Sequence, residues 1–143
     1  MDLIISEAKT ETVDVPVCAC VVKDDKILSL QTNKKEKLND VTAHAEILAL
    51  KEASKALNNW RLEGCDMYVT LEPCPMCLWA IINSRIKNLY FGSFDHNSGG
   101  FSSGLNLLKL ANSSLEVEGG KEEGECDKIL KEYFESLRNE KNT

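Results

Sequence analysis

The fold is decided by residues 67–83, which read Met67-Tyr68-Val69-Thr70-Leu71-Glu72-Pro73-Cys74-Pro75-Met76-Cys77-Leu78-Trp79-Ala80-Ile81-Ile82-Asn83. The apolar run over 67–71 predicts a short strand. Pro75 suits the first turn of a helix, because the N–H that proline lacks would be unbonded there, and a helix is expected from Pro75 to Asn83. A further strand is expected over 87–91. Strand, helix and strand in this order form a β-α-β unit, which implies parallel strands and a right-handed crossover.

The remaining segments predict a mixed sheet with helices on both of its faces. Residues 15–22 are apolar on both faces of a strand, which is typical of a central strand. A turn then leads to a hairpin partner over 27–31. Helices are expected over 46–57 and 127–137, where apolar residues recur at helical spacing, whereas the Gly- and Ser-rich residues 92–104 indicate a loop. We therefore predict the α/β class, with a three-layer α/β/α architecture and a mixed central sheet of about five strands.

Length and composition indicate an ordinary globular protein. The 143 residues are predicted to form a single domain, residues 1–143, which is large enough for a hydrophobic core. No apolar run approaches the length of about 20 residues that spans a bilayer, and the first residues lack the regions of a signal peptide. We therefore expect no membrane association. Six cysteines without an evident disulfide framework favour a reducing, cytoplasmic location.

Two short segments carry the candidate chemistry. The imidazole of His44 and the thiolates of Cys74 and Cys77 are three good ligands for a tetrahedral zinc ion, which leaves the fourth position for water. Zinc lowers the pKa of its water from about 16 toward about 7, so that hydroxide is available at neutral pH. Glu46 lies beside the imidazole in the sequence and is placed to act as the general acid and base. The pattern predicts a catalytic zinc site.

These segments are expected at the starts of two helices. Cys74 and Cys77 share one face of a helix, and the N-terminus of a helix favours thiolates. His44 and Glu46 would point about 200° apart in mid-helix, so they can converge only in a first turn that opens at Thr42. We predict two helix starts that face one metal ion. Taken alone, a Cys-x-x-Cys pair also fits a thiol redox domain or half of a structural zinc site.

The chain resembles the bacterial tRNA-specific adenosine deaminases, zinc enzymes of the cytidine deaminase superfamily. The signature His-x-Glu followed by Pro-Cys-x-x-Cys is common to many deaminases, and the similarity covers roughly residues 15–108. The more particular matches are Val15-Pro16-Val17, Asn59-Trp60-Arg61-Leu62, Tyr68-Val69-Thr70-Leu71-Glu72-Pro73-Cys74, Ser84-Arg85-Ile86, Phe91-Gly92 and Asp95. The resemblance implies the cytidine deaminase-like fold.

The resemblance also implies a reaction. Zinc, one ion per chain, would be held by His44, Cys74 and Cys77, and Glu46 would be the proton shuttle. The implied reaction is hydrolytic deamination of adenosine to inosine at the wobble position of a tRNA anticodon loop, with ammonia as the second product. The family is homodimeric, with the site completed across the interface, so the expected partners are a tRNA anticodon stem-loop and a second copy of the chain.

Three further residues match substrate contacts of the family. Asn33 stands where the family has a base-contacting Asn, the backbone N–H of Ala45 is expected at the base edge, and Asp95 matches the Gly-x-x-Asp loop near the target nucleotide. The simpler interpretations are that Asn33 is an ordinary loop residue and that Asp95 initiates a turn.

Charge and sequence departures leave other functions open. A net charge of −6 with a pI near 5.0 is unlike a protein that binds phosphates over its whole surface, although Lys34, Lys35 and Lys37 form a local basic cluster. A deaminase of a free base or nucleoside, such as guanine, cytosine or cytidine, would need no basic rim. The run Pro-Cys-Pro-Met-Cys-Leu that ends at Leu78 is similar to that of the guanine deaminases. A zinc-stabilised, catalytically silent subunit is the third hypothesis, but a structural zinc has no use for Glu46.

Overall fold

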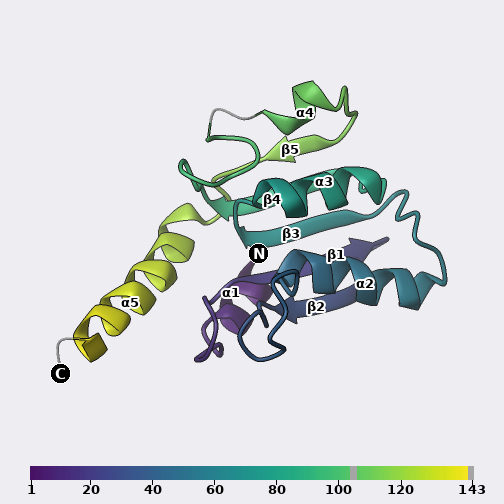
Figure 1. Cartoon of the computed structure of the whole chain (residues 1–143). Coiled ribbons are helices and arrows are strands. Elements are labelled where there is room, and N and C mark those ends of the chain that lie inside the picture. The colour runs from purple at the N-terminus through teal and green to yellow at the C-terminus, as the bar shows by residue number, and fades with distance from the viewer. Residues whose placement is uncertain (104–105, 142–143) are drawn as a thin grey trace.

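One five-stranded sheet organises the chain in the computed structural model, which describes residues 1–103 and 106–141 (Figure 1). The strand order across the sheet is β2-β1-β3-β4-β5. In chain order the elements are α1 (Asp2–Ala8), β1 (Cys18–Lys23), β2 (Lys26–Thr32), α2 (Ala45–Leu57), β3 (Asp66–Leu71), α3 (Pro75–Asn83), β4 (Asn88–Ser93), α4 (Leu107–Leu110), β5 (Glu116–Glu118) and α5 (Glu123–Lys141). The extent of the domain, residues 1–143, stays a prediction.

The pairing of the strands confirms a mixed sheet. β1 lies inside the sheet, antiparallel to β2 on one side and to β3 on the other, as its two apolar faces predicted, although it begins at Cys18 rather than at Val15. β3 and β4 are parallel and are joined through α3, so the predicted β-α-β unit is confirmed. β5 pairs in parallel with the outer edge of β4 and supplies the fifth strand.

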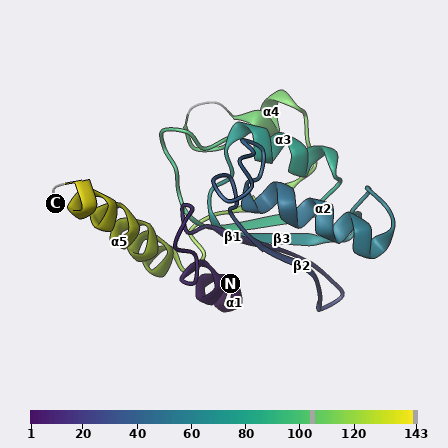
Figure 2. The same cartoon turned by 60° about the horizontal axis from the view of Figure 1, so that its bottom comes forward.

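Helices cover both faces of the sheet and complete the three-layer architecture. Side chains alternate along β1, so Ala19 and Val21 enter the larger core cluster under α2 and α3. Cys18 and Cys20 point the other way and pack with Ile4 of α1 in a second cluster that also includes the beginning of α5. Figure 2 shows α2 and α3 on one side of the strands and α1 on the other, with α5 extending away from the sheet.

Several element boundaries differ from the sequence expectation. α5 is longer than the predicted 127–137 at both ends, because its exposed polar residues continue the helix beyond the apolar positions. The short elements α1, α4 and β5 carry too few residues for a periodic pattern. β4 continues to Ser93, into the predicted 92–104 loop, because Gly92 allows close approach to β3 and α5: a Cβ there would meet the Thr70 carbonyl and Cys126. Gly104 lies outside the described residues.

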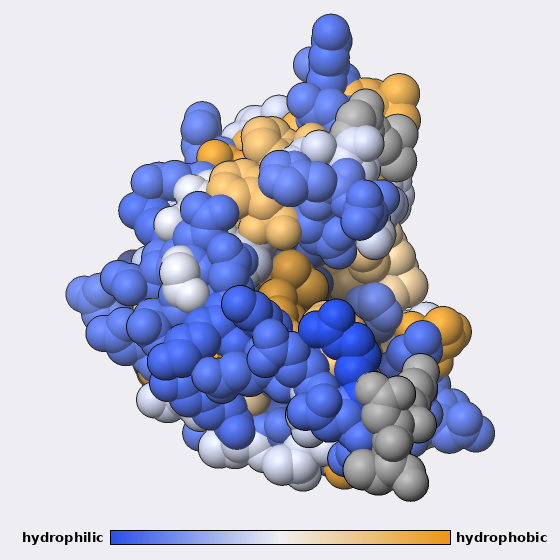
Figure 3. Space-filling model, turned by 90° about the vertical axis from the view of Figure 1, so that its left-hand side faces the viewer, coloured by the Kyte–Doolittle hydropathy of each residue, from blue (hydrophilic) through white to orange (hydrophobic). Residues whose placement is uncertain are grey.

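The fold brings the predicted chemical groups to one end of the molecule. β3 and β4 finish at the end where α2 and α3 start, which is where α/β sheets place their sites. Figure 3 views this end and shows hydrophilic side chains around an apolar hollow. Within the described residues, no helix has the length and apolar character needed to cross a bilayer.

Candidate metal centre and active site

The start of α3 positions the two thiols. Cys74 is the N-cap residue, with an extended backbone at φ −68° and ψ 170°, and Pro75 occupies the first helical position. The backbone N–H of Leu78 donates to the Cys74 carbonyl at 2.9 Å, which closes the first turn. Cys77 lies one turn along and is fully buried. Both sulfur atoms therefore lie where the unpaired N–H groups of a helix start favour negative charge.

The start of α2 positions the imidazole and corrects one expectation. The sequence predicted a first turn that opens at Thr42, with His44 inside it. Instead, α2 begins at Ala45 and His44 is its N-cap residue, in extended conformation at φ −71° and ψ 151°. The bend of the backbone at the cap, rather than a position in the first turn, turns His44 toward the thiols while Glu46 lies within the helix.

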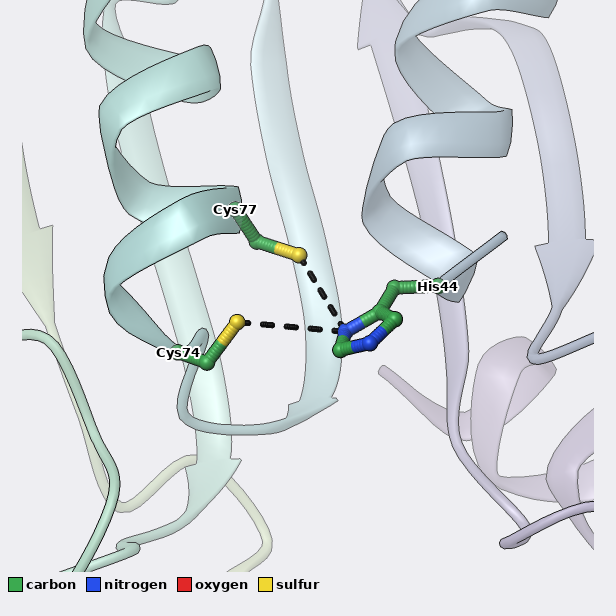
Figure 4. Close-up of side chains that lie close together, drawn as sticks. All are labelled: His44, Cys74 and Cys77. Atoms are coloured by element: carbon green, nitrogen blue, oxygen red, sulfur yellow. Dashed lines mark hydrogen bonds between the residues drawn. The ribbon is translucent and has the colours of Figure 1, made fainter. Parts of the chain in front are cut away.

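The three predicted ligand atoms meet at one point. Cys77 Sγ lies 3.5 Å and Cys74 Sγ 3.8 Å from His44 Nδ1, and all three atoms are within 4.8 Å of one another. A tetrahedral zinc ion, with bonds of about 2.3 Å to sulfur and about 2.05 Å to nitrogen, would hold S and N about 3.6 Å apart. Figure 4 shows the three side chains converging from the two helix starts. The donor set therefore fits zinc in both chemistry and spacing.

The two thiols do not share one protonation state. A hydrogen bond from the Cys77 thiol lowers the pKa of Cys74 to about 5, against the effect of burial and with help from the backbone N–H groups of Cys77 and Met76. The same hydrogen bond and burial raise the pKa of Cys77. The metal-free pair thus holds one proton at neutral pH, and metal binding must release it.

Glu46 is a buried carboxyl group beside the ligand set. Its residue is 5% exposed. Burial raises the pKa of Glu46 to about 7, and the negative charge on Cys74 adds to the rise. A carboxyl group that titrates near neutral pH is suited to take up a proton and give it back.

A cavity of about 250 Å³ opens beside these groups. This volume lies just below the usual range for small-molecule pockets, about 300–1,000 Å³, which suits a single base rather than a larger ligand. Of the predicted site residues, all but the buried Cys77 line it. The lining residues are Val15, Val17, Asn33, His44, Ala45, Glu46, Leu71, Glu72, Cys74, Asp95 and Ser98.

The predicted substrate-contact residues reach the cavity from three segments. Asn33 follows β2, where its backbone N–H donates to the Val17 carbonyl at 3.1 Å. Ala45 is the first residue of α2. Asp95 follows β4, and its carboxylate accepts a hydrogen bond of 3.0 Å from the Ser98 N–H. Sequence reasoning brought these residues together only by resemblance, since nothing in their spacing predicts a shared wall.

Sequence reasoning gave no role to Glu72, which also lines the cavity. Glu72 is 2% exposed, although a carboxylate is rarely buried without partners. The sequence offered one indication that Glu72 is buried: it stands between the end of an apolar strand and Pro73, where a side chain has little access to water. Its hydrogen-bond donors come from residues 95–102, so the partners could not be read from neighbouring sequence.

Comparisons with known proteins agree with this geometry. Residues 2–138 match the sequence model of the MafB19-like deaminase family. The tRNA-specific adenosine deaminase of Aquifex aeolicus is 45% identical over 139 residues, which cover 94% of this chain and 91% of that protein. The chain belongs to the family of the tRNA-specific adenosine deaminases.

Other tRNA-specific adenosine deaminases match equally broadly. The Bacillus subtilis protein is 43% identical over 96% of this chain and 88% of its own length. A solved structure from a study of A-to-I editing by tRNA:A34 deaminases at the wobble position superposes with a TM-score of 0.87 and 40% identity, over 91% of this chain and 97% of that chain. The cytidine deaminase-like architecture is confirmed by this likeness.

The basic cluster predicted from the sequence is partly paired within the chain. Lys37 Nζ lies 2.8 Å from the Glu11 carboxylate in an ion pair. Lys34 Nζ donates to Gln31 Oε1 at 3.0 Å. Lys35 is exposed. The ion pair with Glu11 therefore neutralises the charge of Lys37, whereas Lys34 and Lys35 keep their charges.

Proposed function

We propose that this chain catalyses the zinc-dependent hydrolytic deamination of adenosine to inosine at the wobble position of a tRNA anticodon loop. Two observations together support this proposal. The chain is 45% identical to a tRNA-specific adenosine deaminase over 94% of its length, and His44, Cys74 and Cys77 form a cluster spaced for a metal ion. In the reaction, water supplies an oxygen to C6 of adenine, the C6–N bond breaks, and ammonia leaves.

The chain's residues divide the work. His44, Cys74 and Cys77 would hold the zinc ion, which when bound acts as a Lewis acid and makes water a nucleophile at neutral pH. Glu46, with its pKa raised to about 7 by burial, takes a proton from the attacking water and delivers it to the departing amine. Because Glu46 is not among the three clustered ligands, its carboxylate is free for this transfer.

The cavity walls orient the base. Asn33 and the backbone N–H of Ala45 would hydrogen-bond its edge, and Asp95 would contact the target nucleotide. A cavity of about 250 Å³ admits a base only after it has been unstacked and turned out of its strand. Single-stranded loops of RNA allow this at low cost, since their bases are not paired.

We further propose that the protein acts in the cytoplasm as a homodimer. A groove outside α2 and α3 supports this proposal, because its lining includes Ile47, Leu50, Trp60 and Ala80. Trp60 is 54% exposed, and exposed apolar patches of this kind mark interfaces. Light scattering should give twice the chain mass of 15.9 kDa, and Trp60→Glu should give the monomer; a monomeric wild type would contradict the proposal.

A deamination assay on zinc-loaded protein tests the function. An anticodon stem-loop with a wobble adenosine is compared with free adenosine, guanine, cytosine and cytidine. We expect inosine in the stem-loop alone. Glu46→Ala should lower the rate by at least about 100-fold and keep its zinc, whereas the exposed carboxylate variant Glu63→Ala should match the wild type.

Two outcomes would overturn parts of this proposal. Turnover of a free base or nucleoside alone would retain the chemistry and assign the substrate to the alternative, a deaminase of free bases or nucleosides. Loss of zinc from Glu46→Ala would contradict its role as a proton carrier that is not a ligand.

A further inference from the structure

A buried carboxylate links the metal-ligand motif to the segment that carries Asp95. Glu72 Oε1 accepts a hydrogen bond from the Asp95 N–H at 3.0 Å. Glu72 Oε2 accepts from the N–H groups of Phe101 and Ser102 at 3.0 and 2.8 Å. The Ser102 hydroxyl donates to the same carboxylate. Four donors from residues 95–102 thus converge on one side chain, which stands next to Pro73 and Cys74.

The segment is also pressed onto the start of α3. The Gly100 N–H donates to the Pro73 carbonyl at 2.8 Å. A Cβ on Gly100 would lie 2.9 Å from a methyl carbon of Leu78, and a Cβ on Gly99 would meet the Glu72 carboxylate. Such spacing leaves no room for side chains. The backbone of residues 99–100 therefore lies directly between Glu72 and the helix that holds the thiols.

The position of this segment determines one wall of the cavity. Asp95 and Ser98 belong to the segment and line the cavity. Asp95 is held at both backbone ends, since its N–H donates to Glu72 while its carbonyl accepts from the Gly99 N–H at 2.8 Å. A shift of the Glu72 carboxylate would therefore move Asp95, which is not one of the three clustered metal ligands.

We propose that Glu72 is the positioning residue of the substrate wall: its carboxylate holds residues 95–102 in place and so sets Asp95 against the target nucleotide. The substrate named here rests on the proposed function, whereas the positioning of residues 95–102 rests on the hydrogen bonds to Glu72. An ionised carboxylate is suited to the task because it only accepts hydrogen bonds, and all four groups facing it are donors.

Glu72→Gln tests this role with little change of shape, because the amide places an NH2 group against N–H donors. The matched control is Glu52→Gln on α2, where the carboxylate also accepts a backbone N–H, that of Leu30 at 2.8 Å. In Glu72→Gln, amide hydrogen exchange at Asp95, Phe101 and Ser102 should accelerate by about tenfold to 100-fold, the range for losing a hydrogen bond to a charged acceptor. Glu52→Gln should leave these amides unchanged. Both variants should bind zinc as the wild type does.

Steady-state kinetics on the stem-loop separate positioning from chemistry. We expect KM to rise by about tenfold and kcat to stay within about twofold in Glu72→Gln, because a binding contact is lost equally in the ground and transition states. In an Asp95→Ala background the same substitution should change KM by less than about twofold, since the contact it positions is already gone.

Three results would overturn the proposal. They are unchanged exchange at the three amides, a fall in kcat without a rise in KM, and equal effects of Glu72→Gln in the presence and absence of Asp95. If the wild type does not act on the stem-loop at all, the proposed function fails by itself, while hydrogen exchange still decides whether Glu72 holds the segment.

Discussion

His44 and Cys74 occupy equivalent positions in two different helices. Each is an N-cap residue with extended backbone, His44 at the start of α2 and Cys74 at the start of α3, and their Nδ1 and Sγ atoms lie 3.8 Å apart. The His44 side chain forms no capping hydrogen bond to α2. An N-cap side chain usually accepts a hydrogen bond from a free backbone N–H in the first turn of its helix. Here the two N-cap side chains point toward each other, so two of the three candidate metal ligands stand at capping positions.

Cys77→Ser should remove the metal and lower stability together. The hydroxyl is a poor zinc ligand, and the remaining pair, His44 and Cys74, leaves the site open. Bound zinc, measured by mass spectrometry under native conditions, should fall from about one ion per chain to near zero, with a lower melting temperature. Cys65→Ala, at another fully buried cysteine, should lower the melting temperature and retain zinc. Retention of zinc by Cys77→Ser would contradict the ligand assignment.

The stability of the fold should depend on pH through Glu11. Burial of the Glu11 carboxyl opposes its ionised form, but hydrogen bonds from Lys37 and from the N–H groups of Asp14 and Val13 outweigh burial and lower its pKa from 4.5 to about 2. Because folding lowers the pKa of Glu11, its ionised carboxylate stabilises the fold above pH 4.5. This contribution to the free energy of unfolding is lost as the pH falls toward 2. The contribution should be about 2–3 kcal/mol, discounted for the exposed lysine.

Urea unfolding from pH 7 to pH 3 checks this dependence. Glu11→Gln should be less stable than the wild type by this amount at pH 7, and the difference should shrink as the pH falls. Glu36→Gln removes an exposed carboxylate and should give a small difference that does not vary with pH. A Glu11→Gln deficit that persists unchanged at pH 3 would show that the ion pair does not carry the effect.

Ser93→Ala should raise the free energy of unfolding. Within the part of the chain that the structure describes, the Ser93 hydroxyl is buried without a hydrogen-bond partner, which costs about 1–3 kcal/mol. Removing it should stabilise the fold by about 1 kcal/mol in chemical denaturation. The matched control is Ser29→Ala, because the buried Ser29 hydroxyl accepts from the Val21 N–H at 3.2 Å; its loss should destabilise. A destabilised Ser93→Ala would indicate a partner for that hydroxyl, such as a buried water.

The sequence predicted those features that depend on local patterns. The β-α-β unit around α3 followed from an apolar run, a proline and a helix, all contiguous, and it is confirmed. The meeting of His44 with Cys74 and Cys77 followed from known metal chemistry. The predicted opening of the first turn at Thr42 was wrong, because His44 is the N-cap residue of α2. The extended backbone of His44 depends on the bend into the helix, which residue spacing does not reveal.

Features built from distant segments could not be predicted in this way. The donors to Glu72 come from a Gly- and Ser-rich stretch without periodicity, so neither their number nor their direction is encoded locally. The ion pair between Glu11 and Lys37 likewise joins the segment after α1 to the loop after β2. Both are tertiary contacts whose geometry exists only once the sheet has formed.

The separation of the metal ligands along the chain orders events during synthesis. His44 precedes Cys74 by 30 residues, and β3 lies between α2 and the cysteines. On the ribosome, which releases the N-terminal part first, the hairpin of β1 and β2 and the α2 helix emerge before any thiolate ligand does. The complete set of ligands is therefore available only after Cys77 has left the exit tunnel.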